Sequence, residues 1–234
     1  MPILTVTISK IFKNILKTNK GFTIVEILVA LSLIGLIFTL VANVSGSSRE
    51  YLENSISKIE RATRFATNES ILRNSIVRIH IDLDAEPVEY SIEYGQGADL
   101  VLPQTVDLSR LSIKERETQL KKMEKLDSQF IKVEEFQSSN ELLDEGVSVY
   151  GLVTTYTPDI IDSGHANIYF YPTGERDSAL IVFYNEQEVA TLSVSPFEDR
   201  TQTEFYLLSE TELNNMEYSL EVKSKEVVDK WLKD

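Results

Sequence analysis

One carboxylate stands inside the longest apolar run of the sequence. Glu26 lies near the start of the run Phe22–Val44, which has 23 residues and no other charged side chain. A helix that crosses a bilayer takes about 20 apolar residues. An ionised carboxylate in hydrocarbon is costly without a partner, so an acid in such a run is a candidate functional residue. Glu26 is therefore the first candidate for a residue with a chemical role.

The other side chains with catalytic or metal-binding chemistry form no recognisable set. The chain has no cysteine, so disulfides, thiolate metal sites and a cysteine nucleophile are excluded. We expect His80 in a strand and His165 in a loop, apart from each other. The acids of "DLDAE" (82–86) and "DIIDSG" (159–164) lack the spacing of a calcium-binding EF-hand loop. The sequence favours a protein that is not an enzyme and has no cofactor or metal site.

Charge is distributed unevenly along the chain. The segment before the apolar run contains no acid and four lysines, Lys10, Lys13, Lys17 and Lys20, whereas the whole chain has a net charge of −14. Positive flanks stay on the cytoplasmic side of a membrane, which predicts a cytoplasmic N-terminus and an acidic body on the far side. An acidic body is repelled by phosphate backbones, which argues against nucleic acid as a partner.

The apolar run continues into a segment with helical spacing. A stripe recurs at steps of three and four residues, formed by Leu52, Ile56, Ile59, Ala62 and Ala66. This pattern predicts an amphipathic helix. We expect one helix from about Phe22 to Leu72, with a transmembrane part at 22–45 and an amphipathic part at 46–72. Gly46 is its weak point, because glycine disfavours a helix interior.

Beyond the helix the apolar period changes to two, which is typical of strands with one buried face. "IVRIHIDL" and "VEYSIEY" predict a hairpin, and four more strands are expected at 147–153, 167–172, 179–185 and 189–195. The fold class is therefore α+β, a long N-terminal helix packed on an antiparallel β-sheet or sandwich. We place the β-domain at 73–208, with a polar insertion at 103–145. A helical tail at 209–234 begins with a capping box formed by Ser209 and Glu212.

These features together resemble the type IV pilin and pseudopilin family. The sequence "KGFTIVEILVALSLIGL" matches its pattern of a basic leader ending in glycine, an aromatic residue, T-[LIV]-[LIV]-E and an apolar run. The stretches "RATRFATNESILRNSIVRIHIDLD" and "IYFYPTGERDSALIVF" resemble the H-type minor pseudopilins of type II secretion and the FimT/FimU-like minor pilins. In the second stretch Phe170, Pro172 and Gly174 match an F-x-P-x-G turn.

The resemblance implies a pilin fold and a structural subunit. A prepilin peptidase would remove the leader 1–21 by cutting between Gly21 and Phe22, and the new amine of Phe22 would be methylated. The Glu26 carboxylate of one subunit would then pair with the Phe22 ammonium of a neighbour in a filament. The implied partners are the peptidase, other pseudopilins or pilins, and an inner-membrane assembly platform. The implied location is the bacterial inner membrane, crossed once, with the C-terminal domain in the periplasm.

Three functions remain open on this reading. The first is a minor pseudopilin of a type II secretion system, in the periplasmic pseudopilus that exports folded proteins. The second is a minor type IV pilin that primes or decorates a surface pilus. The third is a signal-anchored periplasmic binding or enzyme domain whose N-terminus resembles a pilin by coincidence and is not processed. Separately, "ANVSGSS" offers a site for ordinary signal-peptide cleavage, although the length of the apolar run favours a retained anchor.

Overall fold

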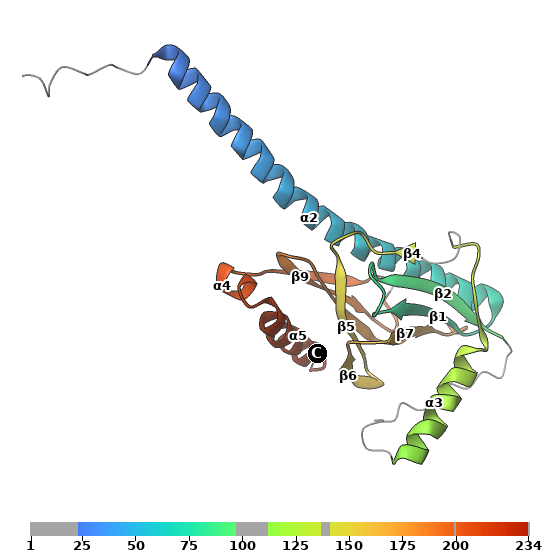
Figure 1. The fold of residues 1–234 in the computed structure, drawn as a ribbon. Helices are drawn as coiled ribbons and strands as arrows, with labels where there is room; N and C mark the ends of the chain where they lie inside the picture. The colour runs from blue at the N-terminus through green and yellow to red at the C-terminus, as the bar shows by residue number, and fades with distance from the viewer. Residues whose placement is uncertain (1–22, 97–111, 137–140, 199, 234) are drawn as a thin grey trace, which may run out of the picture. The chain divides into compact units, whose positions relative to one another are not determined.

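The computed structural model of the chain describes residues 23–96, 112–136, 141–198 and 200–233, without the side chains of 38–47, 120 and 158 (Figure 1). The chain divides into two compact units, Met1–Gly46 and Ser47–Asp234. In the first unit the described residues are helical from Ile24. The second unit contains two antiparallel sheets.

Helix α2 spans Ile24–Arg73. Within the second unit it buries the predicted apolar stripe, because Leu52, Ile59, Ala62 and Ala66 are at most 1% exposed and Ile56 is 3% exposed. The helix ends at Arg73, and the next residue, Asn74, has a left-handed φ of 49°. Asparagine tolerates this conformation better than most residues. The Ser75 N–H then donates to the Ser70 carbonyl at 3.2 Å, which satisfies one of the last carbonyls of the helix.

The first sheet contains the predicted hairpin. Its strands follow the order β3-β2-β1-β7, and β4 pairs with a second stretch of β2. Their bounds are β1 Val77–Asp82, β2 Glu89–Gly95, β3 Phe130–Lys132, β4 Glu141–Leu142 and β7 His165–Phe170. The alternation Val77, Ile79, Ile81 points inward, as the period of two predicts. Strands β3 and β4 come from the predicted insertion 103–145, so part of that segment completes the sheet.

The second sheet has the order β10-β9-β8-β5-β6. Its bounds are β5 Ser148–Thr154, β6 Thr157–Ile161, β8 Ala179–Tyr184, β9 Glu188–Val194 and β10 Gln202–Leu207. The expected strands at 147–153, 179–185 and 189–195 therefore form, whereas the sequence analysis missed β6 and β10. The outer strand β10 alternates between exposed and half-buried residues, which weakens its apolar signal.

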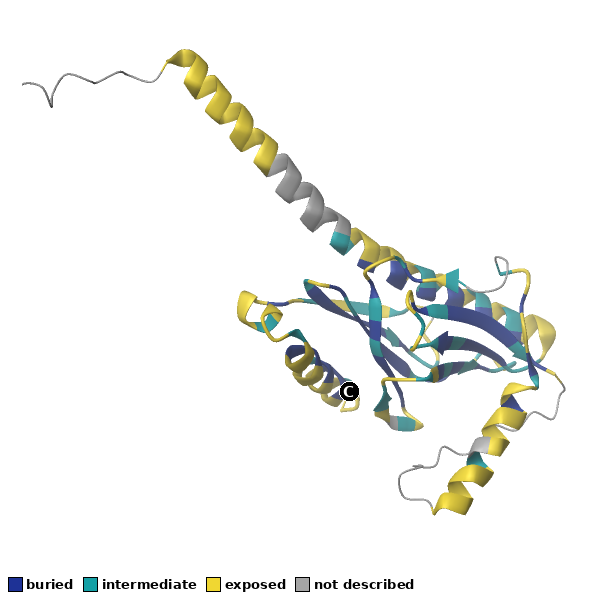
Figure 2. Ribbon diagram, viewed as in Figure 1, coloured by how far each residue is buried: buried dark blue, intermediate teal, exposed yellow. Residues whose placement is uncertain are grey.

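Both faces of β8 are covered, which explains its unbroken apolar sequence. Ala179, Ile181 and Phe183 join the core cluster that includes α2 and residues of both sheets. On the opposite face, Val182 packs with Leu220 and Val227, and Leu180 packs with Val228. Leu220, Val227 and Val228 belong to α5, Met216–Trp231. The face of α5 toward the sheet is buried, while its outer face is exposed (Figure 2).

Two further helices have capping boxes. The short helix α4, Glu210–Leu213, begins with the box predicted at Ser209 and Glu212. Helix α3, Ile113–Asp127, begins with a second box, formed by Ser112 and Glu115. The side chains of α3 are mostly exposed, as expected for a solvated helix, but its end is fixed. Asp127 accepts a hydrogen bond of 2.5 Å from Arg78 Nη1, and Arg78 is buried on β1 beside Glu93.

Replacement of Ile59 by alanine tests the importance of the α2 stripe. Ile59→Ala leaves a cavity between α2 and the sheets, and we expect it to lower the free energy of unfolding by about 2–5 kcal/mol. The measurement is urea unfolding of the full chain in detergent micelles, followed by fluorescence of the single tryptophan, Trp231. The control Leu72→Ala removes a 78% exposed side chain. We expect a change within about 0.5 kcal/mol for the control, and equal losses in both variants would contradict the packing of Ile59 against the sheets.

Candidate functional site

Glu26 lies in the first turn of α2, three residues after the residue that caps it. Thr23 Oγ1 accepts a hydrogen bond from the Glu26 N–H at 3.2 Å, and the Thr23 carbonyl accepts one from the Ile27 N–H at 3.2 Å. Thr23 is therefore the N-cap, and Glu26 is the third helical residue, where a carboxylate is favoured by the helix dipole. Sequence analysis missed this role of Thr23, although the spacing T-x-x-E before an apolar run signals it.

Of the residues predicted for processing, assembly and leader charge, the structure places only Glu26. Gly21 and Phe22, at the expected cleavage site, lie outside the described residues, as do Lys10, Lys13, Lys17 and Lys20. The side chain of Glu26 is exposed in the isolated chain. Its chemistry as a charge partner therefore depends on what surrounds this segment in the cell.

The apolar side chains that follow Glu26 are exposed on every side of the helix. The large ones from Ile27 to Ile37 are between 50% and 60% exposed. A helix that is apolar all round requires apolar surroundings, from lipid or from neighbouring helices.

Among the described residues, no helix meets the length and hydropathy needed to cross a bilayer.

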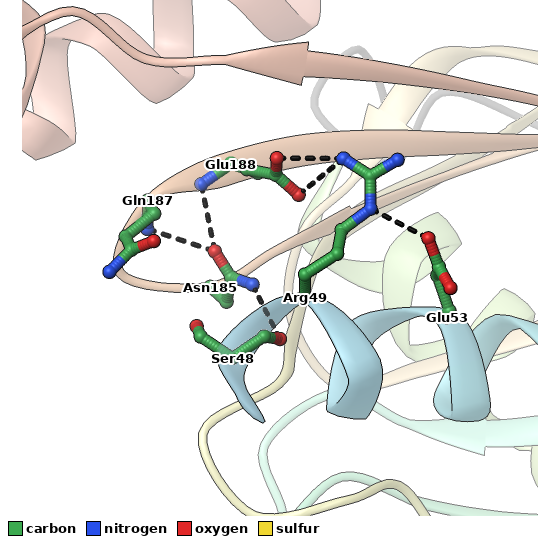
Figure 3. A network of polar contacts seen from close by, with 6 residues as sticks. All are labelled: Ser48, Arg49, Glu53, Asn185, Gln187 and Glu188. Carbon is green, nitrogen blue, oxygen red and sulfur yellow. Dashed lines mark hydrogen bonds and ion pairs between the residues drawn. The ribbon is translucent and has the colours of Figure 1, made fainter. Parts of the chain in front are cut away.

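In the second unit, a polar network joins the start of the amphipathic segment to the turn between β8 and β9 (Figure 3). Arg49 Nη1 donates to both carboxylate oxygens of Glu188, at 2.7 and 2.9 Å, and Arg49 Nε donates to Glu53 at 2.7 Å. The guanidinium also lies 3.8 Å from the centre of the Phe205 ring. Its hydrogen bond to Glu53 raises the pKa of Arg49, desolvation opposes this, and Glu188 raises it further.

Asn185 holds the other side of this network. Its Oδ1 accepts hydrogen bonds from the Gln187 and Glu188 N–H groups at 2.9 and 2.7 Å, which closes the β8–β9 turn. Its Nδ2 donates to the Ser48 carbonyl of α2 at 3.0 Å. Because Asn185 is only 4% exposed, water does not replace these bonds, so one amide fixes both the turn and its position on the helix.

A second set of contacts ties α2 to the segment before β5. Lys58 Nζ donates to Asp144 Oδ1 at 2.7 Å and to the Leu142 carbonyl at 3.0 Å. The Asp144 N–H donates to Ser55 Oγ at 2.9 Å. The helix is thus bonded to two separate connections of the sheets.

The two stretches that carry the resemblance to minor pseudopilins meet in the structure. Near the end of α2, Ser70 Oγ donates to the Tyr171 carbonyl at 3.0 Å. Tyr171 belongs to the F-x-P-x-G turn, where Gly174 has a φ of 88°. Glycine adopts this left-handed conformation without the strain that a Cβ brings. Beyond the turn, burial raises the pKa of Asp177, although the Tyr169 N–H and the Tyr171 hydroxyl both donate to it.

The expectation that the two histidines lie apart is wrong. His165 is the first residue of β7 rather than part of a loop, and β7 pairs with β1, the strand of His80. The two rings lie 4.8 Å apart, and His80 Nδ1 is 2.8 Å from Asn167 Oδ1. Sequence spacing does not reveal such a neighbour, because it depends on the register between strands far apart in the chain.

The two acidic loops also meet. The Leu83 N–H donates to the Gly164 carbonyl at 2.9 Å, and the Gly164 N–H donates to Asp84 Oδ1 at 3.0 Å. In the described part of the chain, no three His, Asp or Glu side chains are grouped so that they would hold a metal ion.

Replacement of Asn185 by alanine tests the network of Figure 3. Asn185→Ala leaves two N–H groups of the turn without an acceptor, and we expect a loss of about 2 kcal/mol in the free energy of unfolding. Urea unfolding of the full chain, followed by Trp231 fluorescence, measures it. The neighbouring variant Gln187→Ala keeps the backbone N–H that donates to Asn185 Oδ1, so we expect little change in the free energy of unfolding. A loss in Gln187→Ala as large as that in Asn185→Ala would contradict this assignment.

Comparison with known proteins gives a match to a family model and weak likenesses to solved structures. Residues 16–42 match the model described as the prokaryotic N-terminal methylation motif, which type IV pilins carry. Two structures of the minor pseudopilin EpsH from the type II secretion system of Vibrio cholerae are similar over 66% and 69% of this chain and 95% and 96% of theirs. Their identities are 10% and 8%, and both TM-scores are 0.34, too low to carry an argument. No curated protein sequence matched the chain.

Proposed function

We propose that this chain is a minor pseudopilin of a type II secretion system, a structural subunit rather than an enzyme. The observation that carries the proposal is the match of residues 16–42 to the N-terminal methylation motif, which includes Gly21, Phe22 and Glu26. In this proposal a prepilin peptidase cuts after Gly21 and Phe22 is methylated. Residues 22–45 then anchor the subunit in the bacterial inner membrane, with its folded domain in the periplasm.

The choice of a minor subunit is supported by the contact between the end of α2 and the F-x-P-x-G turn. Both stretches resemble the H-type minor pseudopilins and the FimT/FimU-like minor pilins in sequence, and the bond from Ser70 to Tyr171 brings them together. The partners in this proposal are the peptidase, other pseudopilins and an inner-membrane assembly platform.

The assembly step follows from the spacing of charges that cleavage would create. Cutting after Gly21 leaves an ammonium on Phe22, four residues before the Glu26 carboxylate. Two opposite charges in an apolar filament interior each need the other, and loss of one partner costs about 3–5 kcal/mol. We infer that Glu26 of one subunit pairs with Phe22 of the next, which sets their register.

Mass spectrometry of the mature N-terminus tests the processing step. From membranes that contain a prepilin peptidase, we expect a chain that begins at Phe22 and carries a methyl group on its amine. Replacement of Gly21 by leucine adds a side chain at the cut, and we expect the full-length precursor to accumulate. A wild-type chain that keeps residue 1, or that starts near Ser47, would overturn the proposal.

Variants of Glu26 and Thr23 separate charge pairing from helix capping. Glu26→Ala removes the charge, and we expect normal cleavage but loss of the subunit from sheared pseudopili, detected by immunoblot. Thr23→Ala keeps the carboxylate and loses only the cap, at a cost of about 1 kcal/mol, so we expect most incorporation to remain. Unchanged incorporation of Glu26→Ala would refute the pairing, and equal loss in both variants would assign Glu26 to the cap alone.

A further inference from the structure

A cleft of about 750 Å³ opens on the second unit, at the end where α2 carries Ser48. Four segments distant in sequence line it: the β1–β2 connection at 85–88, the turn at 145–148, the β8–β9 turn, and the C-terminal helices through Leu213 and Met216. Its size is within the range of pockets that hold small ligands or a few side chains.

The floor of the cleft is apolar. Val88 and Val147 are at most 4% exposed and belong to the main core. Leu213 remains 37% exposed at the side. Asn185 also lines the cleft, and its bonds to Ser48 and to the β8–β9 turn hold that wall in place. The cleft is therefore preformed, with a rigid base and an apolar side chain available to an occupant.

The rim of the cleft carries three exposed carboxylates, Glu86, Glu145 and Glu186, one from each of the three strand connections. Within the residues that the structure describes, none of the three forms an ion pair. Two acids close to them in sequence do form ion pairs, Asp144 with Lys58 and Glu188 with Arg49. Unpaired carboxylates around an apolar floor repel one another, and a cation that binds among them relieves this repulsion.

We propose that this cleft binds a lysine- or arginine-rich segment of a partner protein, with one apolar side chain against Leu213 and the cationic groups on the rim. The charge of the rim selects this occupant, because it repels acidic peptides, phosphate backbones and anionic lipid. A second copy of the chain is disfavoured by its net charge of −14. The proposal goes beyond the role proposed above and does not depend on cleavage of the N-terminal segment.

Fluorescence anisotropy with a labelled Lys-Lys-Leu-Lys peptide tests the proposal on the full chain in neutral detergent micelles. We expect saturable binding to the wild type. The triple variant Glu86→Gln, Glu145→Gln, Glu186→Gln should weaken it by about tenfold, since three charge contacts are lost. Peptides Glu-Glu-Leu-Glu and Lys-Lys-Ser-Lys should bind more weakly than the probe. No binding of the probe, or equal binding of either comparison peptide, overturns the proposal.

A matched variant excludes an effect of net charge alone. Glu50→Gln, Glu117→Gln, Glu124→Gln changes three exposed carboxylates outside the cleft by the same total charge. We expect it to bind the probe as the wild type does, and an equal tenfold loss overturns the proposal.

Analytical sedimentation of the chain tests whether a second copy of the chain occupies the cleft. Self-association that the rim variant abolishes, and that the probe does not displace, assigns the cleft to the chain itself and also overturns it.

Discussion

Burial of one stripe of α2 is the constraint on which the second unit depends. Leu52, Ile56 and Ile59 fill space between the helix and the sheets, while Ala62 and Ala66 are small and allow a closer approach. The same apolar cluster includes residues of both sheets, so neither sheet is buried without the helix. The second sheet needs α5 as well, because β8 has apolar side chains on both faces. One continuous core therefore unites elements from Leu52 to Val194, and α5 closes the remaining face.

Polar contacts add specificity to this core. Arg49, Lys58 and Asn185 bond α2 to connections of the sheets, and Arg78 bonds β1 to the end of α3. Replacement of an ion pair by apolar residues is often neutral, whereas removal of one partner is destabilising. Such contacts thus discriminate between neighbouring registers of the helix on the sheet.

Much of this fold was predictable because the spacing of apolar residues along the sequence differs between helices and strands. The stripe on α2, the hairpin and four more strands all followed from periods of 3.6 and two. The short strands β3 and β4 were missed because two or three residues carry no period. The meeting of His80 with His165 depends on strand register, which is not local in sequence. The same limit applies to the cleft, whose walls come from four distant connections.

At the candidate assembly segment the sequence contributes more than the structure does. Glu26 was identified from sequence because a single acid in an apolar run is conspicuous, and the motif match at 16–42 includes it. The structure adds the role of Thr23, which makes Glu26 part of the helix start as well as a charge. In the proposed pairing the partner of that charge belongs to another subunit, so the isolated chain does not contain it.

The way α2 is held also determines how the second unit would respond to a mechanical load. The buried residues extend over about four helical turns, from Leu52 to Ala66, parallel to a pull along the helix axis. A pull in that direction loads these contacts together, in shear, rather than peeling them apart singly. The bond from Arg49 on the helix to Glu188 on the sheet adds to this resistance. Resistance to extraction of the helix is therefore a collective property of the stripe, and no single contact limits it.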